Sequence, residues 1–217
     1  MLAGGNLLAV LGLDGRAEVV GVRQVDLIGQ RRYRLGGFLR GLGGTERLAS
    51  RTLPPGSSVV LLDGAPVPLA TSLAELGQSW TYRIGPAGRD PSDPSHLTHA
   101  GTVTATSLAP LAPVHVTARR LPAAIVIRWI RRTRLDGDGW NLAEIPLGEE
   151  IEAYEVDILS GGSVVRTIAA STPEVSYGAT AELADFGAAQ STLSLRVHQL
   201  SHTVGRGSPA DVSIPVL

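Results

Sequence analysis

The chain contains no cysteine and no lysine, and only 4% of its residues are aromatic. Without cysteine, disulfide bridges, thiolate catalysis, Cys-ligated zinc and iron–sulfur clusters are excluded within these residues. All 19 basic residues are arginine, so no side chain can form a Schiff base or act as a phosphate-binding lysine. Twenty acidic residues balance them to a net charge of −1, which lacks the basic excess that a general nucleic-acid binder needs.

Long hydrophobic runs are also missing from the sequence. No apolar stretch approaches the roughly 18 residues that span a membrane. The first six residues, 1–6, carry no basic side chain of the kind that opens a secretory signal. We therefore expect neither a membrane anchor nor export by a classical signal.

Glycine and proline are abundant, with 26 and 14 residues, and 43% of the 217 residues are hydrophobic. Short apolar runs of about five to eight residues recur between Gly, Pro, Asp and Ser, which is the pattern of an all-β sandwich or barrel. In the first half, the strands are predicted at 7–13, 17–27, 33–35, 58–62 and 79–84, with a hairpin turn at Asp14-Gly15. The one predicted helical turn is 72–76, where Ser72 and Glu75 have capping-box spacing.

The second half begins after a stiff, proline-rich connector at 108–114, which indicates two domains, 1–110 and 111–217. Including one strand that starts near Pro113, about seven strands are expected, the count of an immunoglobulin-like sandwich. The others are predicted at 125–129, 151–159, 164–169, 174–177, 193–200 and 211–216. Alternation predicts that Ile125, Ile127 and Trp129 face the core, as do Tyr154, Val156 and Ile158.

This order of residues resembles a fibronectin type III domain. The similarity is carried by Trp129 on the second strand, Tyr154 on the third, the run 193–197 on the sixth, and Gly205-Arg206-Gly207-Ser208-Pro209 before the last. The family usually has Tyr where this chain has Leu193, so we expect the hydroxyl-to-backbone bond of the tyrosine corner to be absent.

Longer phrases resemble the C-terminal part of the large baseplate protein of gene transfer agents and related tailed phages. These phrases are 129–134, 146–156, 184–187 and 199–201, together with 33–35, 38–41 and 44–46 in the first half. The resemblance implies a tail-tip or host-specificity component. Members of that family are much longer than this chain, which would then be a fragment or a shortened copy, and the enzyme-like barrel of the family has no counterpart here.

Several sequence patterns suggest chemistry, and each also has a structural interpretation. The glycine-rich stretch 36–44 matches neither phosphate-loop spacing, and we interpret it as a turn. The stretch 136–141 is similar to the start of a calcium loop, but Leu147 stands where a bidentate Glu is required, so a glycine-rich hairpin tip is favoured. Trp140 lies in the same insertion and either recognises a partner or sugar or folds back over the sandwich edge.

Other candidates involve charged residues. His96 and His99, near Asp90 and Asp93, could ligate zinc on a helical turn, but the prolines between them favour a solvated loop. The carboxylates of Glu149, Glu150 and Glu152 are spaced like a glycosidase pair, although a solvated strand entry is the favoured interpretation. The arginine run Arg131, Arg132 and Arg134 is either an anion-binding patch or part of the polar insertion. Finally, Arg128 and Arg196 are predicted to face outward and to form ion pairs with Glu155 and Asp157.

These observations lead to one functional hypothesis and one alternative. The hypothesis is a non-enzymatic structural and interaction component of a phage-like tail tip or baseplate, located in the virion and made in the bacterial cytoplasm. Its expected partners are other tail proteins, further copies of itself, for which a trimer is one arrangement, and a host receptor or glycan. We expect no catalytic residues, no cofactor, no metal, no nucleic acid and no membrane insertion. The alternative is an accessory carbohydrate-binding or spacer module of a secreted glycoside hydrolase.

Overall fold

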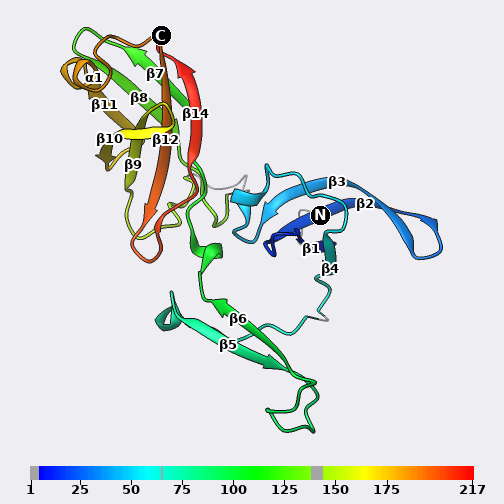
Figure 1. The fold of residues 1–217 in the computed structure, drawn as a ribbon. Helices are drawn as coiled ribbons and strands as arrows, with labels where there is room; N and C mark the ends of the chain where they lie inside the picture. Colours follow the sequence, from blue (N-terminus) through cyan, green and yellow to red (C-terminus); the bar gives the residue numbers. More distant parts are fainter. Residues whose placement is uncertain (1–4, 65, 138–143) are drawn as a thin grey trace. The chain divides into compact units, whose positions relative to one another are not determined.

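The computed structural model describes residues 5–64, 66–137 and 144–217 (Figure 1). The fold is all-β, with 48% strand and 8% helix, as the sequence predicted. The chain forms two compact units, of which the first comprises Met1–Thr45 and Arg51–Ser107, and the second comprises Glu46–Ser50 and Leu108–Leu217. No helix in the described part of the chain is long and apolar enough to cross a membrane.

A four-stranded antiparallel sheet makes up most of the first unit. Its strands are β1 (Leu7–Leu11), β2 (Ala17–Gly29), β3 (Arg32–Leu42) and β4 (Ser58–Leu61), in the order β3-β2-β1-β4. The predicted turn at Asp14-Gly15 joins β1 to β2, with Gly15 at a φ of +75° and the Arg16 N–H donating to Asp14 Oδ1 at 3.1 Å. Strand β3 is longer than the predicted 33–35 because it continues through Gly36 and Gly37, which break the hydrophobic alternation.

The core of this sheet is small. Its buried apolar residues are Leu8, Val10, Val20 and Val22, with Leu35 and Leu53 packed against them. A charged residue, Glu18, is fully buried beside them, and the Arg40 guanidinium binds both of its carboxylate oxygens at 2.6 Å. The interior of the first unit therefore contains a carboxylate, Glu18, and its burial depends on the ion pair with Arg40.

The rest of the first unit is a separate hairpin of β5 (Ser79–Ile84) and β6 (Leu97–Thr102), visible in Figure 1. The sequence predicted β5 and the exposed loop 85–95, but not β6. A short 3₁₀ turn, η2 (Leu73–Glu75), lies in this unit, while η1 (Glu46–Leu48) belongs to the second unit and η3 (Thr106–Leu108) spans the boundary between the units in the sequence. Turn η2 is the predicted helical turn, and the Ser72 N–H donates to Glu75 Oε2 at 2.7 Å, as capping-box spacing requires.

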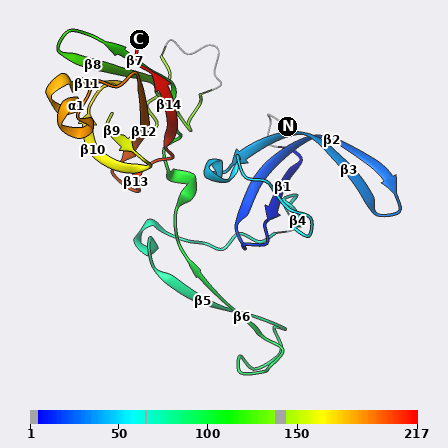
Figure 2. The same ribbon diagram turned by 45° about the horizontal axis from the view of Figure 1, so that its top comes forward.

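The second unit is a sandwich of two antiparallel sheets (Figure 2). One sheet has the order β11-β8-β7, formed by β7 (Val114–Arg120), β8 (Ala124–Ile130) and β11 (Glu174–Gly178). In the other, β12 (Thr192–Ser201) lies between β9 (Tyr154–Ser160), itself paired with β10 (Ser163–Ala170), and β14 (Ala210–Pro215). The short β13 (Gly205–Arg206) pairs with the end of β12. Three strands facing four in this order is the arrangement of a fibronectin type III-like domain.

Alternating residues of both sheets fill the core of this sandwich, as predicted. Ile125, Ile127 and Trp129 are at most 4% exposed, and the Trp129 ring meets Tyr154 edge-on at 5.1 Å between centroids. Leu193 is also buried, at the position where a tyrosine corner would place its ring. Strand β9 begins at Tyr154 rather than at the predicted 151.

The sequence analysis missed the helix α1 (Ala179–Phe186), which follows β11. This helix ends at Gly187, whose φ of +72° and N–H bond to Leu183 O form a left-handed C-terminal cap. Glu182 is the buried residue of α1, and it accepts two bonds from Arg120, at 2.8 and 2.9 Å, and one from the Gln190 N–H. The helix is anchored by this polar contact together with Ala181 and Phe186, which pack against the core of the sandwich.

Candidate functional site

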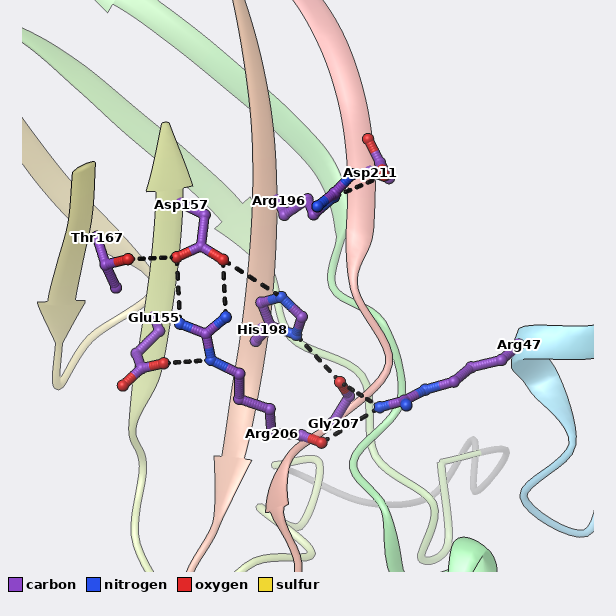
Figure 3. A network of polar contacts seen from close by, with 9 residues as sticks. All are labelled: Arg47, Glu155, Asp157, Thr167, Arg196, His198, Arg206, Gly207 and Asp211. Atoms are coloured by element: carbon purple, nitrogen blue, oxygen red, sulfur yellow. Dashed lines mark hydrogen bonds and ion pairs between the residues drawn. The ribbon is translucent and has the colours of Figure 1, made fainter. Parts of the chain in front are cut away.

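A cluster of charged residues lies on the outer face of the β10-β9-β12 sheet (Figure 3). The strand alternation that points Tyr154, Val156 and Ile158 inward leaves Glu155 and Asp157 on the outer face. The same alternation in β12 leaves Arg196 and His198 outward, and the register places them opposite Asp157 and Glu155, respectively. We call the group Glu155, Asp157, Thr167, His198 and Arg206 the polar cluster.

Asp157 is the centre of the polar cluster and is only 2% exposed. Arg206 donates to it through Nη1 at 2.7 Å and Nη2 at 3.1 Å, and Thr167 Oγ1 donates at 2.6 Å. Burial acts to raise the pKa of Asp157, but the hydrogen bonds from Arg206 and Thr167 outweigh it and hold the pKa below its usual value. Asp157 is thus a carboxylate whose oxygens are occupied by the protein itself.

His198 connects the cluster to the loop that follows β13. Its Nδ1 lies 3.1 Å from Gly207 O, so we assign the proton to Nδ1, which donates to this carbonyl. Its Nε2 lies 3.8 Å from Asp157 Oδ2. Gly207 has no room for a side chain, because a Cβ there would come within 2.5 Å of Pro110 O.

The segment Glu46–Ser50, which belongs to the second unit, also binds this loop. Arg47 Nη2 donates to Gly207 O at 2.9 Å, and Figure 3 shows the Arg47 side chain reaching that carbonyl. Glu46 binds the Arg132 guanidinium at 2.6 Å and accepts the Ala112 N–H at 3.0 Å. We call Glu46–Ser50 the strap, because its side chains tie three separate stretches of the second unit together.

A hollow of about 920 Å³ lies beside the polar cluster. It is lined by Glu46, Arg47, Ser50, Ala112, Asp157, Val164, Arg196, His198, Val204, Arg206, Ser208, Pro209 and Asp211. The charged side chains of this lining are paired within the chain, since Arg196 binds Asp211 at 2.9 Å and Arg206 binds Asp157. Within the ranges that the structure describes, no group of three His, Asp or Glu residues could hold a metal ion. What these contacts do is hold the loop at Gly207 in place, through His198 and Arg47.

Asp157 and Arg196 were predicted from the sequence to lie on this outer face, whereas no polar contact was predicted for Arg47, His198 or Arg206. The predicted carboxylate partner of Arg196 was wrong. Arg196 binds Asp211 of β14, and Arg128, which lies on the other sheet, binds Glu174 of β11. The outward orientation was correct, but the predicted partners Glu155 and Asp157 bind Arg206 instead.

The three neighbouring glutamates hold separate parts of the sandwich. Glu149 binds Arg134 Nε at 3.0 Å, and Glu152 accepts the Tyr154 hydroxyl at 2.8 Å. Glu150 accepts from Ser201, His202 and Thr203, and these bonds lower its pKa to about 2. The structure therefore does not assemble the glycosidase-like pair among them.

The arginine run is bound by acceptors of its own chain. Arg131 donates to the carbonyls of Ile145 and Pro146, at 2.7 and 2.9 Å. Arg132 binds Glu46 of the strap, and Arg134 binds Glu149. This arrangement is structural and explains why the arginines occur together.

The possible zinc residues are dispersed. Asp90 accepts the hydroxyl and the N–H of Ser92, Asp93 accepts the N–H of Ser95, and these bonds lower the pKa of both carboxyls. His99 lies on β6 opposite Tyr82 rather than in the predicted loop. Residues 138–141 of the calcium-like stretch 136–141, among them Trp140, lie outside the described residues. The glycine-rich stretch 36–44 is mostly strand β3, not a turn, although it does turn at 43–44.

Comparison with known proteins gives one match at the N-terminal end. Residues 1–60 match a family model described as "Rcc01698-like, C-terminal", and Rcc01698 is a gene associated with gene transfer agents. No curated protein matches the chain. The matched residues include strands β1, β2 and β3 and nearly all of β4.

Two solved structures are similar at low identity. One is titled "Structure of FN3tt mut", with 11% identity over 49% of this chain and 92% of that chain, at a TM-score of 0.32. The other is the rat CD45 extracellular region, domains d3–d4, with 12% identity over 96% of this chain and 94% of that chain, at a TM-score of 0.35. The fibronectin type III-like assignment rests on the strand order of the second unit. The first 60 residues of the chain are similar to the C-terminal domain of Rcc01698-like proteins.

Proposed function

We propose that this chain is a structural and interaction component of a phage-like gene transfer agent tail tip or baseplate, where it contributes to tail assembly and attachment to the host surface. The observation that carries the proposal is the match of residues 1–60 to the C-terminal domain of Rcc01698-like proteins, because Rcc01698 is a gene associated with gene transfer agents. The proposed location is the virion, and the proposed partners are other tail proteins, copies of this chain, and a receptor or glycan of the host cell.

The surface of the first unit supports an assembly role. Its sheet has a hollow of about 520 Å³ lined mainly by apolar side chains. Several of these are more than half exposed, including Val25 at 54%, Tyr33 at 60% and Leu61 at 51%. Contiguous apolar surface of this kind on a soluble domain marks a site of interaction with another protein. In the proposed function, a neighbouring tail protein covers this face.

The second unit supports a spacer role. Its core is complete within the sandwich, and many of its described charged residues form ion pairs within the unit, which suits a module that holds other parts at a fixed distance. Strap contacts at Gly207 and Arg132 stiffen the end of the sandwich where the polar cluster lies. Such a module presents loops without needing chemistry of its own.

The proposal is tested by deleting the coding segment in the bacterium that carries it and examining the particles released. We expect an epitope-tagged chain to purify with tailed particles, and the deletion to give particles that lack complete tail tips by electron microscopy and attach poorly to cells. Absence of the tagged chain from purified particles, with normal tails after deletion, would contradict the proposal.

A pair of matched variants locates the assembly surface. Tyr33→Glu places a charge in the exposed apolar hollow, whereas Leu183→Glu places one at a similarly exposed position on α1, 55% exposed against 60% for Tyr33. We expect the Tyr33 variant to fail to restore tail tips in the deletion strain and the Leu183 variant to restore them. Equal restoration by both would show that the hollow is not an assembly surface.

A further inference from the structure

Strand β4 forms an open edge of the sheet in the first unit. It pairs antiparallel with β1, and among the strands that the structure describes none pairs with its other side. All of its residues are exposed, with Val59 at 54%, Val60 at 43% and Leu61 at 51%. Open strand edges present unpaired N–H and C=O groups that can bond to another strand.

The hydrogen bonds to β1 show which groups are unpaired. The Leu62 N–H donates to Leu7 O at 2.9 Å, so it points toward β1. Because successive N–H groups alternate in direction along a strand, Val60 also points toward β1, while the N–H and C=O groups of Val59 and Leu61 point away from the sheet. These two residues therefore carry the backbone groups of the open edge.

Several other sheet edges in the described part of the chain carry features that discourage pairing, although β6 likewise has an unbroken register and contains no arginine, no carboxylate and no proline. The opposite edge of the same sheet, β3, has Arg32 and Arg34 and the left-handed Gly37. Strands β7 and β10 both contain a register shift, and both carry arginine. Strand β4 has an unbroken register with β1 and contains no charge and no proline. It lacks the devices by which natural proteins protect an edge, apart from its short length.

We propose that β4 pairs antiparallel with β4 of a second copy of this chain, about a two-fold axis that places Val60 opposite the partner's Val60. In this register Val59 lies opposite the partner's Leu61, so all the outward N–H and C=O groups of both residues are bonded. The segment is uncharged, so pairing with itself brings no like charges together. An isologous contact of this kind closes into a dimer rather than a chain of molecules.

The side chains favour the same occupant. Val59 and Leu61 pair with Val10 and Leu8 of β1, so they share the face on which the small core lies. Across the proposed axis, Val59 meets the partner's Leu61 on that face, and the apolar surface becomes continuous over both sheets. Val59 and Leu61 also line the apolar hollow that the proposed function assigns to a neighbouring tail protein, but the strand pairing uses their backbone groups and leaves that face of the sheet open.

The test is sedimentation velocity of the full chain over a range of concentrations, with a pair of opposite charges at the axis. We expect wild type to dimerise, and Val60→Lys and Val60→Glu each to raise the dissociation constant at least about tenfold, which corresponds to about 1.4 kcal/mol. An equimolar mixture of the two variants is expected to restore the dimer, because Lys and Glu then lie opposite each other. A wild-type monomer at every concentration, or no restoration in the mixture, overturns the proposal.

A second pair of variants tests the backbone bonds. Val59→Pro removes an outward N–H but no bond to β1, whereas Val59→Thr keeps that N–H and the branched shape. We expect the proline variant to be monomeric and the threonine variant to dimerise, with circular dichroism and thermal unfolding confirming that both are folded. Unchanged dimerisation of a folded proline variant overturns the strand pairing.

Discussion

The two units bury their hydrophobic residues in different ways. In the second unit, two sheets face each other, and residues from both, such as Ile127 and Leu195, are fully buried. In the first unit, the main sheet covers a core built around Val20 and Val22, and most of the exposed large apolar side chains of the described chain belong to this unit. The difference teaches that strand content does not make a domain self-sufficient, because a single sheet buries its apolar face only when another layer covers it.

The largest effect is expected when the two units are produced separately. We expect a fragment 108–217 to unfold cooperatively as a monomer, because its sandwich core is complete. A fragment 1–107 is expected to self-associate or to lack a cooperative transition. Differential scanning calorimetry and light scattering check both. A stable, monomeric 1–107 fragment would show that its sheet needs no covering layer.

A large effect within the full chain is expected from Ile127→Ala. This side chain is fully buried, and its truncation leaves a cavity that costs about 2–5 kcal/mol of unfolding free energy. The matched control is Ile130→Ala, on the same strand β8 but 57% exposed, and it is expected to change stability by less than about 0.5 kcal/mol. Urea denaturation followed by circular dichroism measures both variants. Similar losses for the two would contradict a second unit held by its buried core.

A smaller effect is expected from Arg47→Ala in the strap. The substitution removes the bonds to the carbonyls of Gly207 and Arg206, and we expect a loss of about 1 kcal/mol in the second unit. Arg119→Ala is the control, because Arg119 is likewise an exposed arginine of the second unit but lies outside the strap contacts. Thermal unfolding of the two variants is compared at pH 7. An equal change in both would mean that the strap adds no stability.

The smallest effect is confined to acidic pH. Glu150 has a folded-state pKa of about 2, below the ordinary glutamate value of 4.5, so its contribution to stability is present above about pH 4.5 and is lost as the pH falls toward 2. We expect wild type to lose stability in this window and Glu150→Gln to show a shallower loss, with a lower melting temperature at pH 7. Melting temperatures from pH 7 to pH 2 measure this. Parallel curves for the two proteins would contradict the lowered pKa of Glu150 in the folded state.

Sequence alone predicted the strands whose side chains alternate clearly. In β8 and β9, every second residue is large and apolar, which fixed both the strands and their inner faces. Strand β6 was missed because Leu97 is its only large apolar residue, and α1 was missed because it is short and rich in alanine and has the charged Glu182 at its buried position.

The polar cluster was only half predictable for a related reason. Alternation along one strand tells which residues face outward, so Asp157 and Arg196 were placed correctly. The partner of each charged residue depends on which other segments of the chain lie against that face. Arg206 and Arg47 belong to segments whose position in the fold cannot be predicted from hydrophobic alternation. Loop-borne partners are set by tertiary structure, whereas strand faces are set by the local sequence.

The strap has a consequence for how this sequence can evolve. Residues 46–50 are encoded in the middle of the first unit but complete the second, so the chain passes between the units at 45–46, 50–51 and 107–108. A recombination event that transferred only 108–217 into another gene would leave Glu46 and Arg47 behind, and Arg132 and the carbonyl of Gly207 would lose those partners. The fibronectin type III-like domain of this chain is therefore not a freely shuffled cassette, and its two units are inherited most favourably as one piece.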